Sequence, residues 1–245
     1  MAEPFPVAIA LEEGLATLRI QRGSARNALS PELVAALRRS FAELAGEPSV
    51  KAIVLTGTPG YAFAAGIDLR AVCHLASDEI ALYFENVARL LWEVAACPKP
   101  VIAAVSGPAL GAGADLAVAC DVRVAAPDAT FAFPGLAFGL VLGMARLARL
   151  VGPGRAKHLV FTGRRLGAAE AQAFGLVDLV GDDHLGAALA IGQEAAQRPA
   201  EALAAAKTCC GAGTLQDELD PVLASVRRPG FAERLRDFAG ARLGP

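Results

Sequence analysis

The segment Lys99–Asp121, KPVIAAVSGPALGAGADLAVACD, has the composition of an apolar strand, a tight turn and the start of a small-residue helix. Its glycines allow another part of the chain to approach the backbone closely. The helix that follows has free backbone N–H groups at its first residues, near Ala112 and Gly113. Unpaired N–H groups at a helix start favour a developing negative charge, such as a carbonyl oxygen becoming an oxyanion.

A second loop with similar residues lies upstream. The apolar run Lys51–Gly57, KAIVLTG, predicts a strand, and the small-residue segment Tyr61–Leu69, YAFAAGIDL, follows it. The N–H groups near Gly66 and Ile67 are therefore candidates to point at the same oxygen. Two donors from two separate loops would complete an oxyanion hole.

The elements that must position these loops follow an alternating pattern. We expect a hairpin over Val7–Arg22, a helix that begins after the Ser30-Pro31 cap, and another helix from Ser77 to about Val94. The strand at 101–106, the helix at 111–120 and a strand at Val122–Ala126 continue the alternation. This pattern predicts an α/β protein with a mostly parallel sheet. From Pro153 onward the sequence predicts short helices only.

Composition narrows the classes of function. The chain has 245 residues, 54% hydrophobic and 20% charged, and a net charge of −2. These values favour a globular protein and argue against a nucleic-acid or anionic-membrane partner. The five cysteines have no metal-ligand spacing and no signal peptide precedes them, so we expect reduced thiols in the cytoplasm.

Several motifs, in order along the chain, carry a family resemblance. They are RNAL at Arg26–Leu29, KAIVLTG, AFAAGIDL, the segment from Lys99 to Pro134, and the segment from Leu150 to Val180. On these pieces the chain resembles the crotonase superfamily, also called the enoyl-CoA hydratase/isomerase family. The resemblance implies a crotonase-like ββα superhelix over residues 1–180. It also implies a helical C-terminal region, 181–245, that serves oligomerisation and covers the pocket.

The resemblance also implies the ligand and its contacts. The ligand would be a coenzyme A thioester, acting as substrate or ligand, with no resident cofactor and no metal. The two oxyanion donors fall at the N–H of Ile67 and the N–H of Ala112, where the family usually has glycine. Contacts with the adenine and pantetheine carry over to six positions: Ser24, Ala25, Arg26, Ala65, Asp68 and Leu69. Asp68 has an alternative role, bracing its own loop.

The acid/base residues are where this chain departs from the family. Family hydratases use two glutamates to activate and orient a water. The first falls at Asp115, whose side chain is shorter, and the second falls at Gly135, which has no carboxylate. The glycine-rich stretch near Gly143–Arg146 is also abbreviated. A shorter, misplaced carboxylate can cost about 10²-fold in rate, so we expect weakened hydratase chemistry.

Three functions remain open from the sequence. The first is an acyl-CoA-binding protein of the hydratase/isomerase type that stabilises a thioester enolate with altered acid/base residues. The second is an isomerase, decarboxylase or thioester hydrolase using Asp115 or a group from the segment 74–85. The candidates in that segment are His74, Glu79, Tyr83 and Glu85. The third is a non-catalytic acyl-CoA carrier or sensor. In each case we expect a homo-oligomer, a trimer or hexamer, whose pocket a neighbour's helix near Phe231–Phe238 helps to complete.

Overall fold

The larger sheet has six strands in the order β1-β2-β3-β4-β6-β9. The computed structural model describes residues 5–211 and 213–243. The first two strands form the expected antiparallel hairpin, and each later strand pairs in parallel with the one before it in the sheet. The strands are β1 (Val7–Glu12), β2 (Leu15–Ile20), β3 (Ala52–Thr56), β4 (Val101–Val105), β6 (Val122–Ala125) and β9 (Leu179–Val180). The prediction of a mostly parallel α/β sheet is confirmed.

A second, three-stranded sheet has the order β5-β7-β8. Its strands are β5 (Pro108–Leu110), β7 (Thr130–Ala132) and β8 (Leu166–Gly167). The chain therefore alternates between the two sheets before entering a helix, as in β4, β5 and then α4 (Ala112–Ala119). This ββα repeat is the superhelical arrangement that the resemblance implied.

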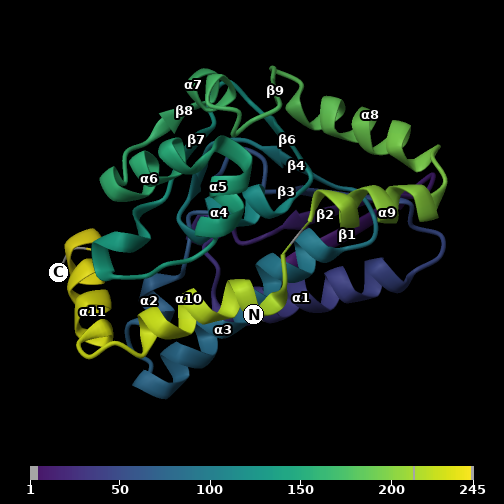
Figure 1. Cartoon of the computed structure of the whole chain (residues 1–245). Helices are drawn as coiled ribbons and strands as arrows, with labels where there is room; N and C mark the ends of the chain where they lie inside the picture. The colour runs from purple at the N-terminus through teal and green to yellow at the C-terminus, as the bar shows by residue number, and fades with distance from the viewer. Residues whose placement is uncertain (1–4, 212, 244–245) are drawn as a thin grey trace.

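Helices cover both faces of the large sheet (Figure 1). On one side lie α1 (Pro31–Gly46) and α3 (Ser77–Ala96), and on the other lies α8 (His184–Ala196). As the sequence predicts, α1 begins after Ser30, whose hydroxyl oxygen accepts a hydrogen bond from the Leu33 N–H. The position of these helices explains why the central strands carry apolar residues on both faces.

Side-chain alternation along the central strands divides the core in two. On β3, Ile53 and Leu55 join the large cluster on the α1–α3 side, whereas Val54 joins a smaller cluster under α8. Strand β4 divides in the same way, with Ala103 in the large cluster and Ile102 in the smaller one. Every residue of both strands is buried. The sheet that supports the two loops is therefore fixed from both sides.

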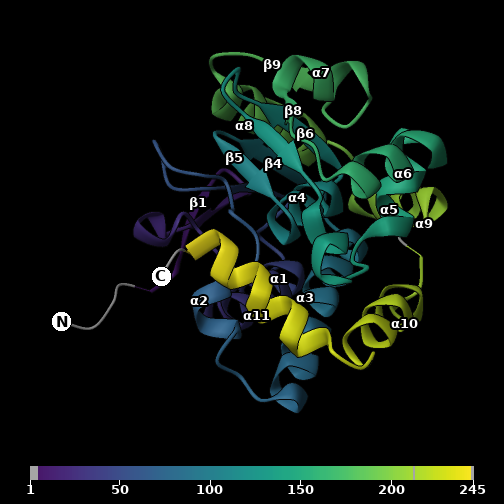
Figure 2. The same ribbon diagram turned by 90° about the vertical axis from the view of Figure 1, so that its left-hand side faces the viewer.

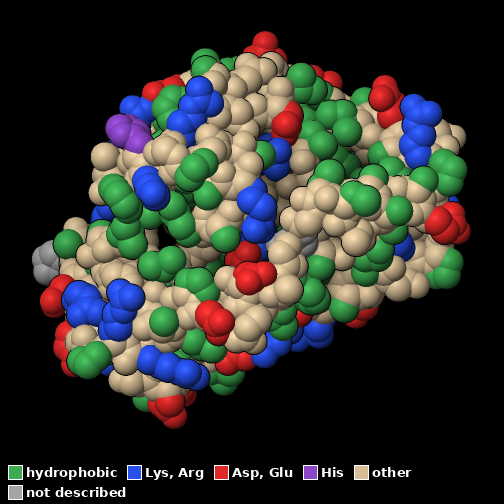
Figure 3. Space-filling view, viewed as in Figure 1, with side chains coloured by type: hydrophobic (Ala, Val, Ile, Leu, Met, Phe, Trp, Pro, Cys, Tyr) green, Lys and Arg blue, Asp and Glu red, His purple; other side chains and the backbone are tan. Residues whose placement is uncertain are grey.

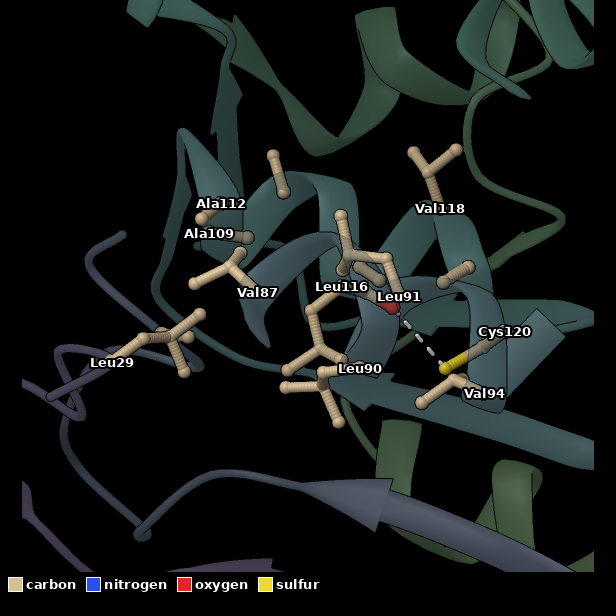
Figure 4. Close-up of a cluster of buried hydrophobic side chains, with 14 of the residues drawn as sticks. Leu29, Val87, Leu90, Leu91, Val94, Ala109, Ala112, Leu116, Val118 and Cys120 are labelled. Carbon is tan, nitrogen blue, oxygen red and sulfur yellow. Dashed lines mark hydrogen bonds between the residues drawn. The ribbon is translucent and has the colours of Figure 1, made fainter. Parts of the chain in front are cut away.

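Helix α4 is buried along its whole length. Figure 4 shows Leu116 and Cys120 of this segment beside Leu90, Leu91 and Val94 of α3. The Cys120 thiol donates a hydrogen bond to the carbonyl oxygen of Leu116, at 3.5 Å. Packing against α3 therefore fixes the axis of α4 and with it the position of its first N–H groups.

The remaining helices lie outside the sheets. They are α2 (Leu69–Val72), α5 (Met144–Val151), α6 (Pro153–Thr162), α7 (Ala168–Ala173), α9 (Ala200–Cys210), α10 (Leu215–Val226) and α11 (Phe231–Leu243), with the short 3₁₀ turns η1 (Gly23–Ala25) and η2 (Pro134–Phe138). Helix α10 packs on α3, and α11 contacts α2 and η2. In Figure 2, α11 crosses in front of α1 and α3.

Two expectations for the chain were wrong. The segment after Pro153 is not helical throughout, because β8 and β9 interrupt it, and the turn after β4 contains the short strand β5. These strands have two or three residues each, too few to show a periodic pattern. Among the described residues, no helix is long and apolar enough to cross a membrane.

Candidate active site

The two glycine-containing loops meet backbone to backbone. The Leu110 N–H donates to the Ala64 carbonyl oxygen at 3.0 Å, and the Ala64 N–H donates to the Pro108 carbonyl oxygen at 3.3 Å. A Cβ atom on Gly113 would overlap the Ala64 carbonyl, and one on Gly66 would lie 2.7 Å from the Leu110 carbonyl oxygen. Glycine is required at both positions because no side chain fits between the loops.

This contact brings the two predicted donors to one cavity. Ile67 and Ala112 both line a cavity of about 290 Å³. Neither N–H donates a hydrogen bond to any residue that the structure describes. Ala112 is the first residue of α4, where an N–H has no partner within the helix. The cavity thus has two free backbone donors from separate segments.

The rest of the cavity wall is mainly apolar. Its side chains come from the first loop and β5, from η2 and the residues on either side of it, from the segment after α6, and from α11. They include Leu69, Leu110, Phe133, Phe138, Leu140, Leu142 and Phe238, with Arg165 and Arg242 as the cationic members. Of the nine predicted site residues, five line this cavity: Ala65, Ile67, Leu69, Ala112 and Asp115.

Ser24, Ala25 and Arg26 do not line the cavity but adjoin its first loop. Ser24 and Ala25 belong to η1, and Arg26 has a left-handed backbone with φ of 52°. The Arg26 carbonyl oxygen accepts a hydrogen bond from the Ala65 N–H, at 3.1 Å. The side chains of Ser24 and Arg26 are exposed. The segment is therefore joined to the cavity through backbone contacts.

Asn27 is a site-supporting residue that the sequence analysis did not single out. Its side chain is fully buried, and its amide donates to the Ala62 carbonyl oxygen at 2.7 Å. Its side-chain oxygen accepts from the Arg22 N–H at 2.9 Å and from the Thr58 hydroxyl at 3.2 Å. Its place within RNAL was the available signal. Asn27 fixes the segment before the first loop to the loop itself.

Asp68 braces its own loop, the alternative role considered for it. Its carboxylate accepts from the Ala71 N–H at the start of α2 and pairs with the Arg22 guanidinium at 3.1 Å. Its side chain does not line the cavity. These two contacts hold the loop that carries the Ile67 N–H.

Asp115 is the cavity's only carboxylate among the described residues. It lies one turn into α4, and 5% of its surface is exposed. Burial raises its pKa well above the ordinary value, while nearby Arg146 acts to lower it and Glu218 to raise it. A carboxyl group in this setting holds its proton more tightly than a solvated one.

Gly135 lies in the cavity wall where the family's second glutamate is expected. A Cβ atom there would be 3.1 Å from the carbonyl oxygen of Leu140, a tight but not impossible contact. Across the part of the chain that is described, no other carboxylate replaces the missing one in this wall. The cavity therefore lacks the paired carboxylates that hold a water between them.

The titratable groups of segment 74–85 do not reach the cavity. Glu79 accepts a hydrogen bond from the Ala76 N–H at the start of α3, and Glu85 pairs with Arg89 at 2.7 Å. The Tyr83 hydroxyl donates to the Leu29 carbonyl oxygen, and burial raises the pKa of Tyr83. His74 is exposed. In this structure, none of these four side chains is part of the cavity wall to which the segment was expected to offer an acid or base.

Helix α11 covers the cavity of its own chain, where the sequence suggested a neighbour's helix. The rings of Phe138 and Phe238 lie 5.0 Å apart, and Phe231 packs against Phe138 and Phe84. In Figure 3 the surface is hollowed between α6 and the end of the molecule that carries α11. The helix therefore forms part of the cavity wall.

The two-sheet ββα arrangement is that of a crotonase-fold protein. A solved structure described as an enoyl-CoA hydratase/isomerase from Bordetella parapertussis superposes with a TM-score of 0.89. It is 31% identical, with 96% of this chain and 98% of that chain covered. The family model for enoyl-CoA hydratase/isomerase matches residues 10–225. The chain belongs to the enoyl-CoA hydratase/isomerase family.

Sequence relatives support this assignment. One relative, named as the enoyl-CoA hydratase/isomerase YngF, comes from Bacillus subtilis (strain 168). It is 38% identical over 171 residues, which cover 69% of this chain and 66% of the relative. Enoyl-CoA hydratase domain-containing protein 2, mitochondrial, of Bos taurus is 40% identical over 169 residues, 68% of this chain and 57% of the relative. The matches thus span less than two thirds of these relatives' own lengths.

Proposed function

We propose that this protein binds acyl-CoA thioesters and stabilises the enolate of the bound thioester. The N–H groups of Ile67 and Ala112 would donate to the thioester oxygen as negative charge develops on it. The observation that carries the proposal is that Ile67 and Ala112, whose N–H groups donate no hydrogen bond within the described structure, both line one cavity. Each such donor contributes on the order of 3 kcal/mol in a transition state.

The rest of the ligand would follow the surfaces next to these donors. The acyl chain would occupy the apolar part of the cavity, formed by residues such as Phe138 and Phe238. The pantetheine would lie along the backbone of Ala65 and Leu69. The adenine would reach the exposed segment Ser24–Arg26, which is bonded to Ala65. Asp68 would contribute indirectly, by bracing the loop.

The proposed proton chemistry depends on one group, Asp115. In its protonated form it can give a proton to the enolate carbon, and in its ionised form it can remove one. Hydration needs a second group to activate and orient the water, and Gly135 supplies none. We therefore expect reversible proton exchange beside the thioester carbonyl, as in an isomerase, and slow hydration of a short enoyl-CoA.

The first experiment separates binding from turnover. Calorimetry with butyryl-CoA measures binding, and deuterium uptake at its α-carbon measures enolate formation. Ala112→Pro should weaken binding and abolish exchange, because proline has no N–H yet fits the first turn of a helix. Ala168→Pro, at the first position of α7, is the matched control. Absence of acyl-CoA binding by the unaltered protein would refute the ligand assignment.

The second experiment tests the role of Gly135. Hydration of crotonyl-CoA, followed by loss of enoyl absorbance, should be slow, and Gly135→Glu should accelerate it by supplying the second carboxylate. Turnover by the unaltered protein above ~10² per second, within the ordinary enzyme range, would contradict this account. Binding of butyryl-CoA without deuterium exchange, together with no hydration of crotonyl-CoA, would favour the non-catalytic carrier function instead.

We also propose that the chain acts as a cytoplasmic homo-oligomer. Helix α9 has no buried residue in the single chain, although it is rich in alanine. Such a surface is suited to a subunit interface in a closed ring. All five cysteines are free thiols, which suits a reducing compartment. Light scattering at micromolar protein that gave the 25.1 kDa of one chain would contradict the assembly.

A further inference from the structure

A buried ion pair joins α5 to the C-terminal helix α10. Arg146 Nη2 lies 3.0 Å from Glu218 Oε1, and the two side chains are 8% and 3% exposed. Within the described structure, none of the three Arg146 guanidinium nitrogens makes a hydrogen bond, nor does that Glu218 oxygen. A buried pair with so few hydrogen bonds contributes little net stability, because desolvation offsets the attraction. Stability alone therefore does not account for it.

The helix that carries Arg146 begins beside Asp115, the only carboxylate of the cavity among the described residues. Asp115 packs against Gly143, the residue before α5, so that a Cβ atom on Gly143 would lie 2.5 Å from Asp115 Oδ1. Arg146 follows in the first turn of the same helix. Helix α4, which carries Asp115, contacts α5 directly. The guanidinium that pairs with Glu218 thus belongs to the helix that begins beside the cavity's carboxylate and packs against α4.

The other charged and titratable groups around the pair are few. Those that act on Arg146 are Glu218 from α10, Asp115 from α4, Arg149 from its own helix and the thiol of Cys120 at the end of α4. Those that act on Asp115 are Arg146 and Glu218. Burial raises the pKa of Cys120 to about 12, so its thiol stays neutral and only Arg149 adds another charge.

We propose that Arg146 and Glu218 are positioning residues that set the balance between the protonated and ionised forms of Asp115. The cation of Arg146 favours the ionised carboxylate, and the anion of Glu218 cancels part of that effect. The consequence for turnover rests on the proposed function, but the charge state of Asp115 is a property of the protein without ligand. The C-terminal region would thereby control which direction of proton transfer Asp115 supports.

Opposite charges on the two residues give opposite predictions. Glu218→Gln leaves the Arg146 charge uncompensated, so Asp115 should lose its proton at lower pH. Arg146→Met removes the cation, so Asp115 should keep its proton to higher pH. In the double variant the two effects should largely cancel. A charge next to a carboxyl group typically moves its titration by about one pKa unit or more, or tenfold in proton affinity.

The measurement is a pH titration of the carboxyl C=O band by infrared difference spectroscopy. The Asp115→Asn variant identifies which band belongs to Asp115. Arg146→Lys retains the cation and should keep the midpoint near that of the unaltered protein, even where Arg146→Met destabilises the fold. Thermal unfolding of each variant shows that it is folded under the conditions of the titration.

Shifts in opposite directions would support the proposal. Shifts of Glu218→Gln and Arg146→Met in the same direction, or an Asp115 midpoint that neither of these two variants moves, would overturn it, because a purely structural ion pair predicts only lower melting temperatures. Opposite shifts in a protein that binds no butyryl-CoA would support this inference and refute the proposed function. Each of the two proposals can therefore be refuted without refuting the other.

Discussion

The contact between Gly113 and Ala64 predicts a large effect from adding one methyl group. In Gly113→Ala the new Cβ would lie 2.7 Å from the Ala64 carbonyl carbon and 2.8 Å from the Ala64 Cβ. These two distances are about 0.6–0.7 Å short of ordinary contact in an interior packed as densely as a crystal, and the Ala64 carbonyl oxygen, which the new Cβ would overlap, is closer still. Both obstructing groups are near or in the backbone, so the two loops must separate.

The expected magnitude follows from two opposing effects. Overpacking a core site costs about 1–3 kcal/mol, whereas replacing glycine by alanine in a helix gains about 1 kcal/mol. The net loss is up to about 2 kcal/mol, which would lower the melting temperature by up to roughly 8 °C in a chain of this size. The function should suffer more, because a displacement near 1 Å can cost about 10²-fold in rate.

The assay compares Gly113→Ala with a matched variant. Gly154 occupies the same second position of α6 that Gly113 occupies in α4, and a Cβ atom there meets nothing within 4 Å. Gly154→Ala should therefore leave the melting temperature unchanged or raise it. If Gly113→Ala melts no lower than Gly154→Ala and binds butyryl-CoA equally well, the two loops are not in backbone contact and the account of the donors is wrong.

Three further outcomes can be measured. Because the pKa of Asp115 is raised in the folded state, the free energy of unfolding falls as pH rises above the ordinary pKa of 3.8. Asp115→Asn should remove this dependence. In denaturant titrations, the stability of the Asn variant relative to the unaltered protein should therefore grow by about 1.4 kcal/mol per pH unit until Asp115 ionises in the folded protein. An Asn variant whose relative stability is constant with pH would contradict the raised pKa. Tyr83→Phe removes one of the two hydrogen bonds that the Leu29 carbonyl oxygen accepts, the other coming from the Asp68 N–H, so chemical denaturation should show a loss of about 0.5–1.5 kcal/mol, and no loss would contradict the hydrogen bond. A maleimide probe followed by mass spectrometry should label the partly exposed Cys73 faster than the buried Cys120, whereas fast labelling of Cys120 would contradict its packing.

The sequence predicts the parts of this fold that have a strong local signal. The β-branched and alanine-rich runs of β3 and β4 indicate burial on both faces, and the Ser30-Pro31 cap marks the start of α1. The glycines on either side of Ala112 indicate a close approach of backbone. Where several such signals occur in order, they also indicate which loops must meet.

Other features depend on partners distant in the chain. Helix α10 contains Pro221 in its interior, which obscures its helical signal. The pairing of Arg146 with Glu218 joins segments whose residues look like ordinary solvated charges when read separately. The position of segment 74–85 away from the cavity follows from the packing of α3, which no local pattern encodes. Only the three-dimensional structure places these groups.

Because the two donors are main-chain amides, they survive almost any replacement of the side chains around them. Loss of a carboxylate at position 135 leaves the N–H groups of Ile67 and Ala112 where they were. On the proposed function, mutations in the cavity wall would therefore alter the reaction, whereas retention of the ligand would continue to depend on the fold. A scaffold of this kind could then diverge through catalytically poor intermediates that would still hold the thioester, which would give selection a bound substrate on which to refine new chemistry.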